Sequence, residues 1–243
     1  MNMKRLKYIY KKQYELDKMM EQIATSIGYS NGVVTDGIFS PKNYLEANVK
    51  IMFLLREPHD DGGWAGREAI RDKFESYRKR EGENTGWKTY FDLMSYVLYS
   101  VQNGYLSWDD CPDAEIDINI RKLILSIAFV NCSKIPGGAT INKKLWWERV
   151  DRFWPVVSKQ ITLAAPDVII CMGTNNFLEK QNFLVDCEAK GKIGETDRYY
   201  YKNKISRQLI LDWYHPIQRR LSRQKYFDNI IEVLKKEKIA LKM

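Results

Sequence analysis

The stretch IMFLLREPHDDGGWAG, residues 51–66, is the most informative part of the sequence. The apolar run at residues 49–55 that leads into it predicts a buried strand, because uninterrupted apolar runs of this length are typical of strands covered on both faces. The run ends abruptly in Arg56, Glu57, Pro58 and His59, and two aspartates, two glycines and Trp64 follow. A simple connecting turn does not need so many charged groups, so we expect a functional loop here.

Three more apolar runs of strand length follow, at residues 124–130, 167–172 and 208–213. Helical patterns lie between them, and strands that alternate with helices predict a parallel sheet covered on both faces. We therefore expect an α/β fold, a three-layer α/β/α arrangement with a central four-stranded parallel sheet. The expected helices are at residues 4–26, 67–79, 87–102, 118–123, 144–163 and 222–238, and we expect a loop at 31–47 and an edge ribbon at 199–201.

The composition of the 243 residues fits one domain, with an N-terminal helical segment at about residues 1–30. Apolar residues make up 44% of the chain, enough for a sizeable core. The net charge of +8 favours a polyanionic partner. No apolar run approaches the roughly 18 residues of a membrane helix, so we expect a soluble, cytoplasmic monomer with no membrane contact. The four cysteines form no Cys-x-x-Cys pair, which predicts reduced thiols.

Chemically versatile residues follow the predicted strands. The ligand crevice of a parallel sheet lies beyond the carboxyl ends of its strands. Glu57 follows the first predicted strand, Asn131 the second and His215 the fourth. The two histidines of the chain, His59 and His215, both fall within a few residues of a strand end. This shared placement predicts that these side chains meet at one site.

Several motifs, in this order, resemble those of the uracil-DNA glycosylase superfamily. They are an acidic-Pro turn after a strand, an aromatic residue beyond it, a strand that ends in Asn, and a late strand followed by His-Pro. In this chain they are LLREPHDDGGWAG, SIAFVNCSK and LILDWYHPIQRRLS, and VIICMGTNN matches the strand before the last. The resemblance spans roughly residues 49–236. It implies a monofunctional DNA glycosylase that hydrolyses the N-glycosidic bond of uracil or a related damaged base flipped out of DNA.

The resemblance also implies roles for the motif residues. Glu57 would position or activate the attacking water, and His215 would stabilise the departing base. Asn131 would recognise the edge of the base, while Trp64 would stack on its face beside Pro58 and His59. The partner would be single- or double-stranded DNA, or a nucleobase. The loop after His215 would enter the duplex with a wedge residue and hold phosphates with arginines, through Ile217, Arg219, Arg220, Leu221 and Arg223.

Two departures from the family concern Arg56 and the cysteines. Most members have Gly or Gln at the position of Arg56, so this arginine would point a cation at the pocket or pair with Glu57. One branch of the family holds an iron–sulfur cluster with four cysteines, but the cysteines here lack that spacing. We therefore expect no cofactor and no metal.

Other interpretations remain open at the level of sequence. The chain could be a catalytically silent protein of the glycosylase fold that binds nucleic acid or a nucleobase. It could instead be a metal-dependent phosphoesterase with His59, Asp60 and Asp61 as ligands, although hard-cation sites usually gather carboxylates from several strand ends. Purely structural roles are also possible, with Glu57 capping a helix, Asn131 capping a turn and Trp64 packed in the core.

Overall fold

A computed structural model gives the structure of the chain and describes residues 3–58, 62–75, 85–114, 116–137, 143–218 and 220–239. The elements follow one another in this order: α1 (Met3–Ser26), β1 (Gly37–Ile38), α2 (Pro41–Glu46), β2 (Ile51–Leu55), α3 (Gly66–Glu75), α4 (Thr85–Gln102), α5 (Ile118–Lys122), the 3-10 helix η1 (Leu123–Ser126), β3 (Ala128–Asn131), α6 (Lys143–Ala164), β4 (Val168–Met172), α7 (Asn175–Lys180), β5 (Cys187–Lys192), β6 (Tyr199–Asn203), β7 (Leu209–Trp213) and α8 (Arg223–Lys236).

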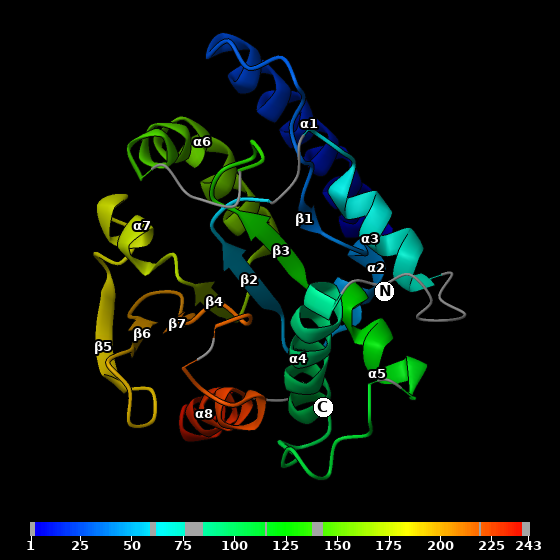
Figure 1. Ribbon diagram of the computed structural model, residues 1–243, viewed down its shortest axis with the longest axis vertical. Helices are drawn as coiled ribbons and strands as arrows, with labels where there is room; N and C mark the ends of the chain where they lie inside the picture. The colour runs from blue at the N-terminus through cyan, green and yellow to red at the C-terminus, as the bar shows by residue number, and fades with distance from the viewer. Residues whose placement is uncertain are drawn as a thin grey trace.

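The strands form one seven-stranded sheet in the order β1-β3-β2-β4-β7-β6-β5 (Figure 1). The neighbours β3, β2, β4 and β7 run parallel. Antiparallel pairing adds β1 at one edge, and β6 followed by β5 at the other. The predicted α/β class is confirmed. The four predicted strands are the parallel centre of the sheet, but the sheet as a whole is mixed and has three more strands.

Most of the elements that we did not predict are short or polar. β1 has two residues and α2 starts at Pro41, and both lie in the segment 31–47 that we expected to be a loop. β5 is polar and largely exposed, so it lacks the apolar signal of a buried strand. This edge strand carries Lys190 and Lys192, and its pairing with β6 is irregular between Ala189 and Gly191. The second predicted strand begins later than expected, because η1 occupies the first part of its apolar run.

Alternate residues of the central strands face two separate hydrophobic cores. In β2, Phe53 and Leu55 join the core that includes residues of α4 and α8, while Met52 and Leu54 join the core that includes residues of α1 and α6. Figure 1 shows α4 and α8 on one side of the sheet and α1 and α6 on the other. Because both faces of β2 are covered, all five of its residues are buried, which explains its unbroken apolar sequence.

None of the helices in the described part of the chain is both long enough and apolar enough to cross a membrane. The four cysteines are free, as predicted. Cys132 and Cys171 are buried in the sheet region, and Cys111 and Cys187 are half-buried.

Candidate active site

The segments that follow β2 and β3 continue side by side beyond the sheet. The backbone N–H of Ser133 donates to the carbonyl oxygen of Arg56 at 2.9 Å, and the N–H of Gly137 donates to that of Pro58 at 2.9 Å. These bonds extend the pairing of the two strands past their ends. They fix the backbone on both sides of Glu57, so its position is set by the fold and not by a loose loop.

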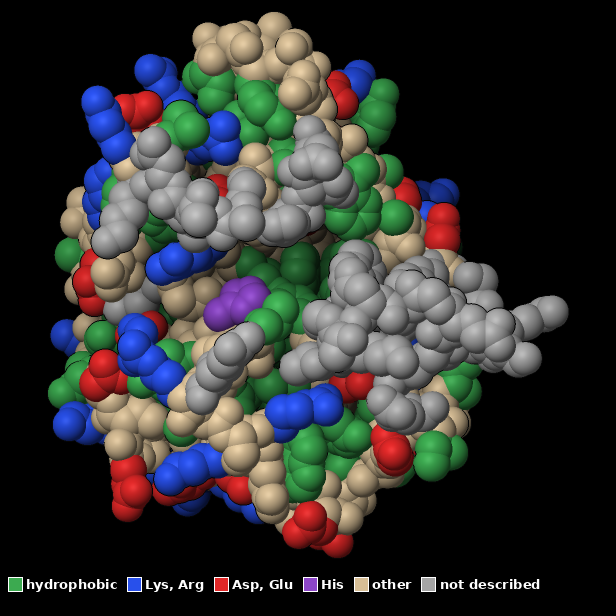
Figure 2. Space-filling view, viewed as in Figure 1, with side chains coloured by type: hydrophobic (Ala, Val, Ile, Leu, Met, Phe, Trp, Pro, Cys, Tyr) green, Lys and Arg blue, Asp and Glu red, His purple; other side chains and the backbone are tan. Residues whose placement is uncertain are grey.

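A cavity of about 370 Å³ lies at this end of the sheet, on the face that packs against α4. Glu57, Asn131 and His215 line it, together with Pro58 and Trp64. Figure 2 shows this face of the molecule, with a histidine side chain at a hollow beside hydrophobic side chains. As we expected, side chains that follow three different strands therefore lie around one cavity.

The carboxylate of Glu57 lies against the backbone of Gly137, in the segment after β3. A Cβ atom built on Gly137 would lie 2.0 Å from Oε1 and 2.2 Å from Cδ of Glu57. Any side chain at position 137 would therefore push this carboxylate away. The sequence signals a turn at Gly137 but not this contact, which depends on the pairing of two distant segments.

Asn131 is buried at the end of β3 and is held by Asp36. Its backbone N–H donates to Oδ2 of Asp36 at 2.7 Å, and its side-chain Nδ2 donates to the same oxygen at 3.1 Å. Asp36 also lines the cavity. An asparagine amide has two N–H donors and one carbonyl acceptor, so with respect to the described residues one donor and the acceptor remain for a ligand.

His215 follows β7, and its ring lies with its centroid 5.4 Å from that of Tyr90. The backbone N–H of Ile217 donates to Nδ1 of the ring at 3.3 Å. Because Nδ1 accepts, the proton of the neutral ring is on Nε2, which is then a hydrogen-bond donor. His215 is partly exposed, but the protein atoms around its ring reduce its hydration and lower its pKa, and the nearby Arg56 cation lowers the pKa further. Both effects favour the neutral ring.

Arg56 extends across the end of β4. Its Nε donates to the carbonyl oxygen of Gly173 at 3.1 Å, and its guanidinium lies 5.8 Å from the centroid of the Trp146 ring. These contacts hold the guanidinium of Arg56 near the end of β4. Arg56 thus influences the site through its effect on the pKa of His215.

Aromatic side chains form much of the cavity wall. Phe129 stacks on Phe39, with ring centroids 5.3 Å apart, and meets Tyr90 edge to face at 5.9 Å. Trp64 lines the same cavity, and its buried Nε1 has no hydrogen-bond partner among the described residues. We predicted only Trp64 from the sequence. Phe129 was also detectable, because it precedes Asn131 by two residues on a strand and so shares its face.

The loop after His215 has one exposed apolar side chain at the cavity. Ile217 lines the cavity and is 52% exposed. Leu221 of the same loop is partly buried and packs against the core. The guanidinium groups of Arg220 and Arg223 lie over aromatic rings, at 5.7 Å and 6.0 Å from the ring centroids.

Some predicted residues lie outside the described part of the chain. They are His59 and Arg219, and also Asp60 and Asp61 of the alternative metal site. Within the described ranges, no group of three or more His, Cys, Asp or Glu side chains is arranged to hold a metal ion.

No protein-family model and no curated protein matches this chain. The site itself offers a carboxylate, a buried amide, an imidazole and an aromatic wall around one cavity.

Proposed function

We propose that this protein is a DNA glycosylase that hydrolyses the N-glycosidic bond of uracil, or of a related damaged base, flipped out of DNA. The main support is that Glu57, Asn131 and His215 line one cavity. Its volume of about 370 Å³ is within the range of about 300–1,000 Å³ that is usual for small-molecule sites. An enzyme that acts on a base in a duplex must extrude it into such a pocket.

Glu57 and His215 match the two charges that develop when the glycosidic bond breaks. The sugar becomes positive and the departing base becomes negative. A carboxylate near the sugar stabilises the first charge and can take a proton from the attacking water. A neutral imidazole that donates through Nε2 stabilises the second charge. Because the ring is already neutral, it can donate a hydrogen bond without giving up its proton.

Asn131 and the aromatic wall fit the recognition of a planar base. The amide of Asn131 offers a donor and an acceptor, which complements the paired groups on the edge of uracil. Phe129 and Trp64 offer apolar ring surfaces at the same cavity. Stacking of a base on an aromatic ring is worth about 1–3 kcal/mol in nucleic-acid complexes.

The loop after His215 fits a role in DNA binding. The exposed Ile217 beside the cavity suits a wedge that fills the space left by the extruded base. Arg220 and Arg223 follow Ile217 in the chain and supply positive charge. Contacts from such residues to phosphates would weaken with salt, because binding releases counterions from DNA.

An oligonucleotide assay tests the proposal directly. The protein is incubated in EDTA with a labelled oligonucleotide that contains one uracil, and abasic sites are then cleaved with alkali. We expect strand breaks at the uracil and none in the matched thymine oligonucleotide. DNA that is bound without breaks would favour the catalytically silent alternative. Cleavage only after addition of a divalent metal would favour the phosphoesterase.

Gly137→Ala is expected to slow uracil release by about 10²-fold, the cost typical of a misplacement of about 1 Å at a catalytic site. The new methyl group would occupy the space of the Glu57 carboxylate and displace it. The measurement is the single-turnover rate of base release. Gly62→Ala is the matched control, because a Cβ there would make only an ordinary contact, 3.5 Å from a backbone oxygen. Equal rates for Gly137→Ala and the parent would show that the position of Glu57 is unimportant.

Arg56→Gln is expected to move the acid limb of the pH–rate profile to higher pH. The guanidinium lowers the pKa of His215, so its removal raises that pKa. The ring then becomes protonated at a higher pH as the solution is acidified. An NMR titration of the His215 ring in both proteins measures this shift apart from catalysis. A shift to lower pH, or none, would mean that Arg56 does not act on His215.

A further inference from the structure

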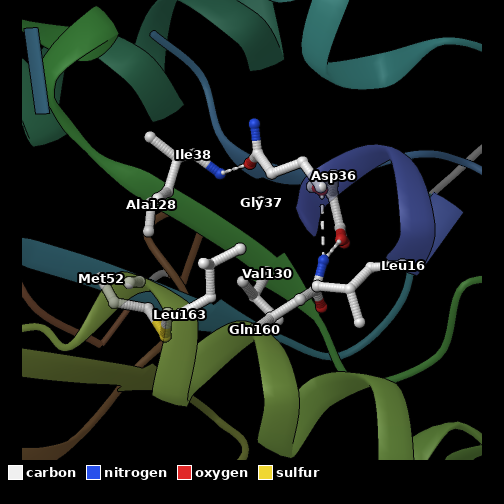
Figure 3. A pocket seen from close by; sticks show the side chains of 11 residues that line it. Leu16, Asp36, Gly37, Ile38, Met52, Ala128, Val130, Gln160 and Leu163 are labelled. Atoms are coloured by element: carbon white, nitrogen blue, oxygen red, sulfur yellow. Dashed lines mark hydrogen bonds between the residues drawn. The ribbon is translucent and has the colours of Figure 1, made fainter. Parts of the chain in front are cut away.

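Asp36 is the centre of a buried hydrogen-bond network behind Asn131. Lys134 is fully buried, and its Nζ lies 2.7 Å from Oδ1 and 3.0 Å from Oδ2 of Asp36. Gln160 on α6 donates to Oδ1 of Asp36 at 2.8 Å and accepts from Lys134 at 2.8 Å. Figure 3 shows Gln160 and Asp36 joined in this way. The side chain of Asp36 is therefore the common hydrogen-bond acceptor of this network.

This arrangement decides which way the amide of Asn131 points. Oδ2 of Asp36 accepts from Nδ2 of Asn131 at 3.1 Å. A flipped amide would instead bring the carbonyl oxygen of Asn131 against this carboxylate oxygen, and two acceptors repel each other. The amide therefore has one favourable orientation. Lys134 and Gln160 prevent the carboxylate from turning away, because each holds it from another side.

We infer that Asp36 is a positioning residue that fixes the Asn131 amide and so selects bases with a ring N–H next to a carbonyl group. This inference rests on the proposed function. Uracil presents that pattern, whereas cytosine presents a ring nitrogen acceptor next to an amino group. A fixed amide that complements the first pattern opposes the second at both hydrogen bonds. Asp36 thus extends the recognition of the base to a residue that does not have to touch it.

Asp36→Ala tests the inference because it removes the carboxylate oxygen that accepts from Nδ2 of Asn131 at 3.1 Å. The amide of Asn131 then loses the contact that separates its two orientations. Both orientations become accessible. We expect the ratio of uracil release to cytosine release to fall by about 10- to 100-fold, the effect of about one buried hydrogen bond left unmade. An unchanged ratio in a folded variant would overturn the inference.

Asp17→Asn is the matched control. Asp17 binds Arg67 at 2.6 Å, and Arg67 donates to the backbone oxygen of Asp36 at 3.0 Å. The control therefore weakens the same region without changing the acceptor that faces Asn131. We expect a lower melting temperature and the same ratio of uracil to cytosine release. If both variants changed the ratio of uracil to cytosine release equally, the cause would be a general loss of packing. That result would also overturn the inference.

A second test measures the binding of free bases to the parent protein. It depends neither on catalysis nor on whether a variant folds. With ¹⁵N labelling, uracil should shift the side-chain amide signal of Asn131, and cytosine at the same concentration should leave it unchanged. Equal shifts with both bases would overturn the role of Asp36. If uracil alone shifts the signal but the oligonucleotide assay shows no base release, the base selection that the inference requires stands and the proposed catalysis fails.

Discussion

Replacing Glu57 with glutamine is expected to slow uracil release by about 10²- to 10⁴-fold, the usual contribution of a positioned general base. Glutamine keeps the size of the side chain but cannot take a proton from water or balance a positive sugar. Its contact with Gly137 can remain, so the loops after β2 and β3 should keep their pairing. The rate is measured under single-turnover conditions, so that product release does not limit it.

Binding of the variant to uracil-containing DNA separates chemistry from recognition. We expect Glu57→Gln to bind this DNA as tightly as the parent, because the amide and aromatic contacts of the cavity remain. Glu195→Gln is the control for loss of a negative charge, since the side chain of Glu195 is 93% exposed and lies in the turn before β6. A Glu57→Gln variant with the parent's rate would exclude Glu57 as the catalytic carboxylate.

His215→Ala is expected to slow uracil release by about 10²- to 10³-fold, the typical cost of losing one donor to a developing anion. The ring is neutral and donates through Nε2, so alanine leaves the departing base without this hydrogen bond. His215→Gln, which again offers an N–H donor, should recover part of the rate. The measurement is again the single-turnover rate of release.

The acidity of the leaving base gives a second test of His215. 5-Fluorouracil forms a more stable anion than uracil, because fluorine withdraws electrons. It needs less help from a donor, so His215→Ala should slow its release less than it slows release of uracil. An equal loss for both bases would indicate that His215 has a structural role, and that the leaving anion is stabilised elsewhere.

The sequence was most informative where both faces of an element are buried. The apolar runs of β2, β4 and β7 identified strands, because such strands need no polar face. The carboxyl ends of such strands also pointed to Glu57, Asn131 and His215, which meet at one cavity. Their chemical roles remain predictions.

Other parts of the site could not be predicted because they depend on contacts between distant segments. Asp36 lies in a stretch with turn-forming residues, and nothing in its local sequence indicates that Lys134 and Gln160 surround it. The closeness of Gly137 to Glu57 likewise arises only when two loops pair. Short elements such as β1 escaped prediction because two residues carry too little pattern to recognise.

Both edges of the sheet have features that hinder pairing with a strand of another molecule. An unpaired edge exposes backbone donors and acceptors that a second chain can use as a template. On one side the edge strand is β1, which offers only two residues. On the other it is β5, where Lys190 and Lys192 add charge and the irregular pairing near Gly191 interrupts a straight ladder. Aggregation by strand pairing at these edges is thereby disfavoured, although the chain has many strongly apolar strands.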